Sequence, residues 1–374
     1  MAVFDSPITT YSDTTPQKRV ITDVISILDP SDAPAVDALG GLDGASGKFR
    51  FVNEKGTAVV WLEDNLGPLA DALAASCTSD ATTITVADAS VLQPGHIINI
   101  DLEQIWVSAT NTTTNVITVT RNFGGTQATH ASAAAVAIIG MARLEGAESD
   151  AIAFTDRYTG TNYTQILHKE IKVTRTQSQI AQYGISDEMA YQGDKVVPEL
   201  MRLLERHFYY NAAAKAGSGT TPRAMGGVRA FVTDNTVAGT TLASSHFENA
   251  VKAAYEDGGE GPWFAFCAPT NYQKVKNFYD NSTYLQIPRS ETTVGMVITK
   301  VVTPFGDVNL VLDRWAKTTE IPIIDPKHAG FKTFYPFTQE PLAKSGDYER
   351  SEVVGEFTLC VRQDKAHALL TAVS

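Results

Sequence analysis

Two long segments of the chain have apolar and polar positions in the pattern that is typical of β-strands. The first, residues 48–65, is rich in β-forming residues and includes Trp61. The second, residues 161–180, alternates, with Ile166 on one side and Ile171 and Val173 mostly on the other. We interpret both as long strands and as candidate antiparallel partners. About a hundred residues separate them, which is too long for a plain loop in a compact domain, so a folded unit is expected there.

The intervening segment, Cys77–Ala142, contains a series of short strand patterns. Four such segments, and a fifth after them, are residues 82–88, 96–101, 104–110, 115–121 and 134–139. Turn-forming residues separate them at Pro94-Gly95, at Asn111–Asn115 and at Gly124-Gly125. Short strands at this spacing predict a small β-barrel or β-sandwich, inserted between the two long strands.

The longest helical pattern follows the second long strand. Its apolar face at helical spacing comprises Val197, Leu200, Met201, Leu204 and Phe208. Asp194 is the expected N-cap, Pro198 falls in the first turn, where proline is tolerated, and Gly217 ends the helix. The spacing therefore predicts a helix over residues 195–216.

The remaining segments alternate between helix and strand. Residues 1–20 are polar and predict an extended arm, a short helix is expected over 18–29, and a loop rich in glycine follows it. Residues 223–340 predict a mixed α/β domain with its own sheet. Its two helices begin with capping boxes, Ser245 to Glu248 and Thr270 to Gln273, and a hairpin turns at Pro304–Asp307. Residues 350–373 predict one or two closing strands.

Composition narrows the class of protein. The chain has 374 residues, of which 43% are hydrophobic and 19% charged, as in a globular protein of two or three domains. The formal charge of −12 argues against a protein that coats nucleic acid. Three widely spaced cysteines, no long apolar run and no signal-peptide pattern favour a protein made and used in a cytosol, with no membrane segment.

Two glycine-containing stretches invite a phosphate-binding interpretation, and neither sustains it. In Gly41–Phe49 the spacing differs from that of a phosphate-binding loop, since Leu42 replaces a required glycine and Phe49 stands where Ser or Thr would bind magnesium. Gly124-Gly125 follows a strand, but the residues after it end in β-branched side chains rather than forming a helix. We interpret this pair as a turn within the inserted unit.

The sequence contains no constellation typical of a catalytic centre. The seven histidines never occur at a spacing that would bind zinc on one helix, and no nucleophile-elbow motif occurs. Glu145, Glu148 and Asp150 are interpreted as a solvated face. On the long helix, the charged residues Arg202, Glu205, Arg206 and His207 are explained by ion pairs along the helix surface, or by contact with a neighbouring subunit or a packaged genome. We assign no catalytic, cofactor-binding or metal-binding residue.

Three parts of the sequence stand out in this order: "DVISILDPSDAPAVDALGG", then "TNYTQILHKEIKVTRTQ" followed by "YGISDEMAYQ", and finally "GDYERSEVVGEFTLCVRQDKAHA". With these segments, the order of the elements resembles the major capsid protein of tailed bacteriophages with the Hong Kong 97-like fold, of the kind with a β-domain inserted in the extended loop. The resemblance implies an α+β fold with these parts: an N-terminal arm and short helix (1–45), extended-loop strands (46–76 and 143–180), the inserted β-domain (77–142), a peripheral domain with the long spine helix (181–222 and 341–374) and an axial domain (223–340).

The resemblance also implies a function. A shell protein of this kind assembles with itself into hexamers and pentamers around double-stranded DNA, which it contacts only weakly and nonspecifically, and it works with separate scaffolding, portal or decoration proteins. Some members of the family crosslink a lysine to an asparagine of a neighbour. Lys55 or Lys169 with Asn281 or Asn309 would be candidates, but nothing selects a pair, so we do not carry this chemistry over.

Two other functions stay open from the sequence. The inserted β-unit, with its turns rich in Thr and Asn, suits display on a surface, so the chain is alternatively a binding module that recognises a glycan or receptor on a self-assembling scaffold. A hydrolase built on the α/β domain is the third interpretation, and it has no visible nucleophile and base.

Overall fold

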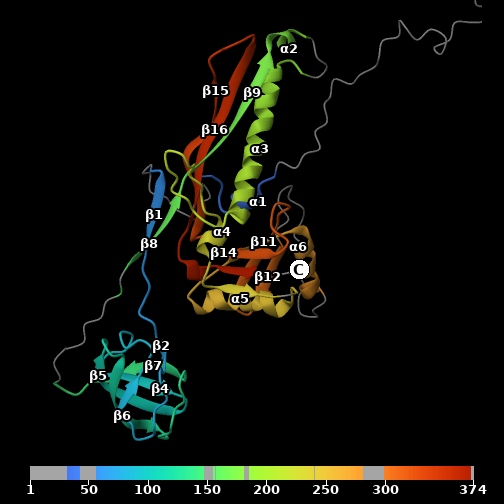
Figure 1. Cartoon of the computed structure of the whole chain (residues 1–374). Helices are drawn as coiled ribbons and strands as arrows, with labels where there is room; N and C mark the ends of the chain where they lie inside the picture. Colours follow the sequence, from blue (N-terminus) through green and yellow to red (C-terminus); the bar gives the residue numbers. More distant parts are fainter. Residues whose placement is uncertain are drawn as a thin grey trace, which may run out of the picture. The chain divides into compact units, whose positions relative to one another are not determined.

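The computed structural model describes residues 32–42, 56–146, 155, 157–180, 185–239, 241–280 and 299–371. They belong to two compact units (Figure 1). One unit contains the described residues up to Trp61 and from Gly160 onward, and the other spans Leu62–Thr159. The helix expected over residues 18–29 lies outside the described residues. None of the helices in the described ranges is long and apolar enough to cross a membrane.

The unit Leu62–Thr159 is a small β-barrel. Its six strands, in sheet order, are β2 (Ala70–Ala72), β7 (Ala135–Met141), β4 (His96–Ile100), β5 (Glu103–Asn111), β6 (Val116–Gly125) and β3 (Thr83–Thr85). A bridge between Leu73 and Val86, just beyond β2 and β3, joins the two edges of this sheet. Inward-facing residues such as Ile98, Ile105 and Ile117 are fully buried, because side chains alternate between the two faces of each strand. The expected strands are confirmed.

The glycine pair Gly124-Gly125 does not form the expected turn. Both residues lie at the end of β6 and pair with Gln104 and Glu103 of β5. Gly125 has a φ of +76°, and a Cβ there would lie 2.2 Å from the carbonyl oxygen of Leu102. The pair is therefore required for a close approach of backbones in a left-handed conformation, and the turn that follows begins later in the chain.

The larger unit contains a six-stranded mixed sheet. Its strands, in sheet order, are β10 (Thr236–Ala238), β17 (Ala368–Thr371), β14 (Glu320–Ile324), β11 (Trp263–Cys267), β13 (Gly306–Leu312) and β12 (Thr299–Thr303). Helices α5 (Ser244–Glu256) and α6 (Pro269–Asp280) pack on one face, where Trp263 and Ala265 point. Phe264 and Phe266 point to the opposite face and belong to a second core. Alternation along one buried strand thus connects two layers of apolar side chains.

A second, long sheet of the same unit lies beside the spine helix (Figure 1). It has the strand order β15 (Ala329–Pro341), β16 (Tyr348–Val361) and β9 (Gln165–Thr174), all antiparallel. The spine helix is α3 (Glu188–Tyr210), and it packs on β9 and β16. The shorter elements are α1 (Pro34–Ala38), α2 (Arg175–Gln179), α4 (Val228–Phe231), the 3-10 turn η1 (Asp364–Ala366) and the two-stranded sheet of β1 (Ala58–Glu63) with β8 (Tyr158–Tyr163).

The spine helix differs from its predicted bounds at both ends. It begins at Glu188, where Asp187 caps it by accepting hydrogen bonds from the backbone N–H groups of Met189 and Ala190. Pro198 therefore lies in the helix interior rather than in its first turn. The helix ends at Tyr210, before the expected Gly217, because the backbone of Gly227 covers its last turn and donates to the carbonyl oxygen of Asn211.

The buried face of this helix is close to the predicted one. Leu200, Leu204 and Phe208 are buried as expected, and Met201 is partly buried. Val197 is 37% exposed, and its neighbour Val196 is buried instead. Val196, and not Val197, is one helical turn before Leu200 in the row of buried positions that recur every four residues.

Other details of the prediction are also corrected. Both capping boxes are wrong, because Ser245 lies inside α5, whose N-cap is Ala243 without a side-chain bond, and Thr270 lies inside α6. The loop expected after residue 30 contains the short helix α1. The hairpin that turns between β12 and β13 is confirmed.

The two long strands near the inserted unit pair with each other only in part. β1 pairs with β8, whose last residues fall in the expected second strand, whereas the rest of that strand, β9, pairs with β16. The pattern of polar and apolar residues gives the face of a strand but not its partner, and the C-terminal β16 supplies a longer ladder for β9. The strands are also distributed between the sheets differently from the expected domains. Most of β15 was expected in the axial domain, but it belongs to the sheet beside the spine helix, and β17 was expected in the peripheral domain, but it belongs to the six-stranded sheet. The expected domain limits themselves stay a prediction.

Candidate functional site

The residues considered for crosslinking or phosphate binding are not assembled into a site by the described part of the chain. Lys169 lies on β9 and forms an ion pair with Glu199 of α3. Asn309 lies inside the ladder of β13, between β11 and β12. Lys55, Asn281 and most of the Gly41–Phe49 stretch lie outside the described residues, as do Glu148 and Asp150. Glu145 is exposed after β7.

The histidines do not gather around a metal site. Within the described ranges, no group of three or more metal-ligating side chains occurs. His367 is fully buried between two backbone partners, since it accepts the N–H of Asp325 at Nδ1 (3.0 Å) and its Nε2 lies 3.1 Å from the carbonyl oxygen of Arg362. Burial lowers the pKa of His367 to about 4. A neutral imidazole with both nitrogens engaged is a structural element of the core.

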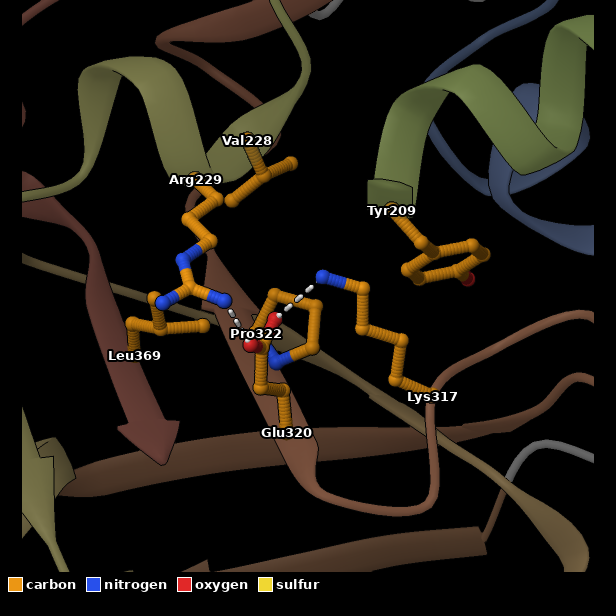
Figure 2. A pocket seen from close by; sticks show the side chains of 7 residues that line it. All are labelled: Tyr209, Val228, Arg229, Lys317, Glu320, Pro322 and Leu369. Atoms are coloured by element: carbon orange, nitrogen blue, oxygen red, sulfur yellow. Dashed lines mark hydrogen bonds and ion pairs between the residues drawn. The ribbon is translucent and has the colours of Figure 1, made fainter. Parts of the chain in front are cut away.

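A shallow depression lies between the end of the spine helix and the six-stranded sheet. Figure 2 shows its lining, which consists of Tyr209, Val228, Arg229, Lys317, Glu320, Pro322 and Leu369. Glu320 holds both cations, at 2.6 Å from Arg229 Nη1 and 3.1 Å from Lys317 Nζ. The free space is about 10 Å³, which admits no more than a single water molecule. The ion pairs at this depression connect α4 to the sheet, and the free space is too small for a ligand.

The inserted barrel contains a buried network of charges around Glu103. Arg121 binds both carboxylate oxygens of Glu103, at 2.8 and 2.7 Å, and the backbone N–H of Ala128 and Nε2 of His130 complete the shell, at 3.0 and 3.1 Å. His130 Nδ1 lies 2.8 Å from Asp101. Burial alone would raise the pKa of Glu103, but these hydrogen bonds outweigh it and lower the pKa to about 2.

This network explains the stretch that contains Gly124-Gly125. Arg121 and His130 flank the glycines in the sequence, and the side chains of both contact the carboxylate of Glu103 on the neighbouring strand. Arg121 also donates to the carbonyl oxygens of Thr78 and Ala128. A bidentate, fully enclosed pair of this kind fixes the course of a loop. The stretch is therefore a structural clamp and not a phosphate-binding loop.

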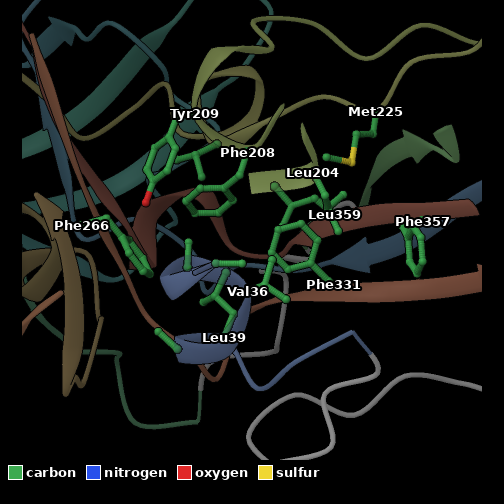
Figure 3. Packing of buried hydrophobic residues seen from close by; sticks show 14 of the residues in the cluster. Val36, Leu39, Leu204, Phe208, Tyr209, Met225, Phe266, Phe331, Phe357 and Leu359 are labelled. Atoms are coloured by element: carbon green, nitrogen blue, oxygen red, sulfur yellow. The ribbon is translucent and has the colours of Figure 1, made fainter. Parts of the chain in front are cut away.

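A second buried cluster joins the spine helix to α1. Glu205 accepts the backbone N–H groups of Ala35 (2.6 Å) and Val36 (3.1 Å), and Figure 3 shows the α1 side chains, among them Val36, packed below the spine helix. Tyr209 donates to Asp313 Oδ2 at 2.6 Å. Burial raises the pKa of Glu205, and a hydrogen bond with Asp313 raises it further. Glu205 is thus neutral at pH 7, and its side chain forms a hydrogen bond with that of Asp313.

The sequence did not reveal this cluster. Glu205 was expected to pair along the helix surface, and that interpretation is wrong, because its side chain is fully buried. Arg202 and Arg206, its supposed partners, lie over the rings of Trp315 and Tyr210, at 5.8 and 5.4 Å from the ring centroids. Only its position one helical turn from both Met201 and Tyr209 hinted that Glu205 belongs to the core face.

The surface most suited to assembly consists of strands that have, among the described residues, no partner strand on one side. β15 and β9 are the two edges of the long sheet, and β1 and β8 form a sheet of only two strands. On β1, Val60 is 56% and Leu62 is 70% exposed. An open edge offers hydrogen bonds to another chain. These edges can bind a neighbouring strand, whereas the buried clusters above cannot meet a partner.

Comparison with known proteins identifies relatives of the whole chain. The family model described as SU10 major capsid protein matches residues 8–374. No protein among those with a curated function matches the sequence.

Solved structures resemble the fold at low sequence identity. The protein of Microbacterium phage Oxtober96 is 12% identical, with a TM-score of 0.52 and coverage of 98% of this chain and 99% of that one. The capsid of the empty GTA particle is 9% identical, with a TM-score of 0.52 and coverage of 100% of both chains. The cyanophage A-1(L) capsid is 9% identical, with a TM-score of 0.53 and coverage of 98% and 99%. The expected α+β, Hong Kong 97-like fold is confirmed.

Proposed function

Because this chain belongs to the SU10 major capsid protein family, and is therefore a structural subunit of a capsid, we propose that its copies assemble into hexamers and pentamers that close an icosahedral head around double-stranded DNA. The observation that carries the proposal is the two-stranded sheet of β1 and β8, with its exposed Val60 and Leu62. One face of this sheet is covered by the subunit itself, where Trp61 packs on Phe231. Val60 and Leu62 alternate with Trp61 along the strand and so lie on the opposite face, which a second copy of the chain can cover.

The proposal extends to partners and place of assembly. The subunit contacts packaged DNA weakly and without sequence preference, because a net charge of −12 leaves little basic surface for phosphate. Separate scaffolding, portal or decoration proteins are the other expected partners. Assembly takes place in the cytoplasm of a bacterial host. The protein acts through shape and contact and has no enzymatic activity.

A charge on the exposed sheet tests this function. Purified full-length protein, alone and coexpressed with viral assembly proteins, should give rings, tubes or shells by negative-stain microscopy and sedimentation. Val60→Glu should leave the circular dichroism spectrum unchanged, because Val60 is 56% exposed in the monomer. The same variant should no longer assemble, because the neighbour would have to bury an unpaired charge. Monomers of the unaltered protein under every condition would contradict the proposal.

A further inference from the structure

The outward face of the spine helix carries two arginines that the rest of the subunit does not neutralise. Within the described ranges, neither Arg202 nor Arg206 has a carboxylate within ion-pair distance. Both guanidinium groups lie over aromatic rings, Arg202 over Trp315 and Arg206 over Tyr210. A cation held against an aromatic ring keeps its charge and its hydrogen-bond donors available.

The acidic residues near this face are engaged elsewhere. Glu199 pairs with Lys169, and Glu320 pairs with Arg229 and Lys317. Glu205 points into the core. The face therefore has a local excess of positive charge in a chain whose formal charge is −12.

Apolar surface accompanies the charge. Leu203 is 46% and Tyr210 is 48% exposed, and both lie on α3 beside the arginines. We call the set Arg202, Leu203, Arg206, Tyr210 and Trp315 the α3 basic face. Arginine, tyrosine and tryptophan around an apolar centre are the residues that dominate protein–protein contacts.

The chain enters the subunit beside this face. Asp32 pairs with Arg314 at 3.1 Å, and its carbonyl oxygen accepts the indole N–H of Trp315 at 3.0 Å. Trp315 is the ring under Arg202. The segment that precedes Asp32 is therefore tethered at the edge of the α3 basic face.

That preceding segment has the complementary chemistry. Residues 20–31 read "VITDVISILDPS", with acidic Asp23 and Asp29, six aliphatic side chains and no lysine or arginine. Asp29 lies three residues before Asp32, a span of at most about 10 Å. Because Asp32 binds Trp315 and Arg202 lies over the same ring, this span brings the carboxylate of Asp29 within reach of the Arg202 guanidinium group.

We propose that residues 20–31 dock on the α3 basic face of the same chain. Asp29 and Asp23 pair with Arg202 and Arg206, and the aliphatic side chains cover Leu203 and Tyr210. DNA is the other polyanion that a shell subunit meets. It fits less well, because half of this face is apolar and because the tether at Asp32 holds the acidic segment beside it at a high effective concentration.

A zero-length crosslink tests the contact directly. Arg206→Lys places a primary amine on the face, and a carbodiimide then joins it only to a carboxylate in direct contact. In the monomeric fraction of full-length protein, peptide mapping should find position 206 joined to Asp23 or Asp29. The variant that also carries Asp23→Asn and Asp29→Asn should lose that crosslink. A crosslink to other acids only, or only between isotopically distinct chains, would overturn the proposal.

Charge reversal supplies a second measurement. Arg202→Asp with Arg206→Asp should speed hydrogen exchange in residues 20–31, and adding Asp23→Arg with Asp29→Arg should restore protection. Arg202 is half-buried and Arg206 is exposed, so the arginine variants should fold. Unchanged hydrogen exchange of residues 20–31 in the arginine-to-aspartate variant would overturn the docking. If that variant instead lost only the ability to bind added duplex DNA, the face would be a nucleic-acid contact and the proposal would be wrong.

Discussion

Buried ionisable side chains in this subunit fall into two kinds, according to what surrounds them. Glu103 is enclosed by donors, so it stays charged and its pKa is about 2. Glu205 is enclosed with another acid, so it stays neutral and its pKa is raised. The same residue type is thus held in opposite protonation states in the two units, and each state gives a different dependence of stability on pH.

For the inserted barrel, Arg121→Ala is expected to be strongly destabilising. The substitution leaves Glu103 buried without its main partner, which typically costs about 3–5 kcal/mol of unfolding free energy. Urea titration followed by hydrogen exchange of β5 and β6 measures the loss. The control, Arg157→Ala, removes an exposed ion pair with Asp64 and should cost less than about 1 kcal/mol. Equal effects of the two substitutions would show that the clamp contributes little.

The same clamp predicts loss of stability in acid. Because the pKa of Glu103 is lowered from 4.5 to about 2, the stabilisation is present above about pH 4.5 and is lost as the pH falls through about 2. Protection of β5 and β6 should decline over this window. In Glu103→Gln, protection should be lower at neutral pH and should change less between the same two pH values.

For Glu205, the predicted change of stability with pH has the opposite sign. Its raised pKa means that the folded protein holds a proton that the unfolded chain releases above about pH 4.5, so unfolding free energy should fall as the pH rises above that value. Glu205→Gln, which resembles the neutral acid, should flatten this decline in urea titrations between about pH 5 and pH 9. Glu199→Gln, at a partly exposed position of the same helix, should keep the original slope. A parallel decline in both variants would contradict a neutral Glu205.

At the scale of the element, the spine helix shows which features of a helix a sequence defines. The stripe of Leu200, Leu204 and Phe208 predicted its existence and its buried face. Its ends were not predictable, because Asp187 and Asp194 are equally good caps from the sequence alone. The C-terminal end depends on Gly227, which packs over the last turn although it lies outside the helix. The local pattern of apolar residues determines that a helix forms and which face is buried. Tertiary packing determines where the helix ends.

Two neighbouring leucines on this helix make a matched test of its orientation. Leu204 is 1% exposed and Leu203 is 46% exposed. Leu204→Asp buries a charge without a partner and should abolish soluble, folded protein, whereas Leu203→Asp should remain soluble with an unchanged circular dichroism spectrum. Normal particle yield from Leu204→Asp would refute the placement of the buried face.

The partners of strands were harder to predict than the strands. Alternation identified the residues of β9, but the ladder that it forms is with β16, which lies almost two hundred positions later, as in the pair Leu167 with Gly355. Glu205 and Asp313 meet for the same reason, through the packing of segments distant in sequence. The sequence of a single chain does not show which distant segments pair, because the alternating pattern of each strand is compatible with many partner strands.

At the scale of the whole molecule, the division into two units suggests a deletion. The chain leaves the larger unit through β1 and returns through β8, and these strands are neighbours in one sheet. A variant lacking residues 66–155, closed by a short Gly-Ser linker, should therefore fold and keep the spine helix, as circular dichroism and limited proteolysis would show. Insoluble protein would contradict the independence of the two units.

The same deletion separates the two roles considered for the inserted barrel. If the barrel is part of the shell, the variant should form fewer or weaker particles in negative-stain images. If it is a surface-displayed binding module for a glycan or receptor, particles should form normally and only attachment to cells should be lost.

The position of β17 has a consequence for the timing of synthesis. This strand, Ala368–Thr371, is inserted between β10 and β14 in the interior of the six-stranded sheet. Until translation has passed Thr371, that sheet lacks the strand between β10 and β14, whereas the barrel at 62–159 already has all its strands. The barrel can fold during translation, but the larger unit cannot close until translation has passed Thr371. A subunit whose sheet is completed only after Thr371 has been made is protected from joining its neighbours before that point.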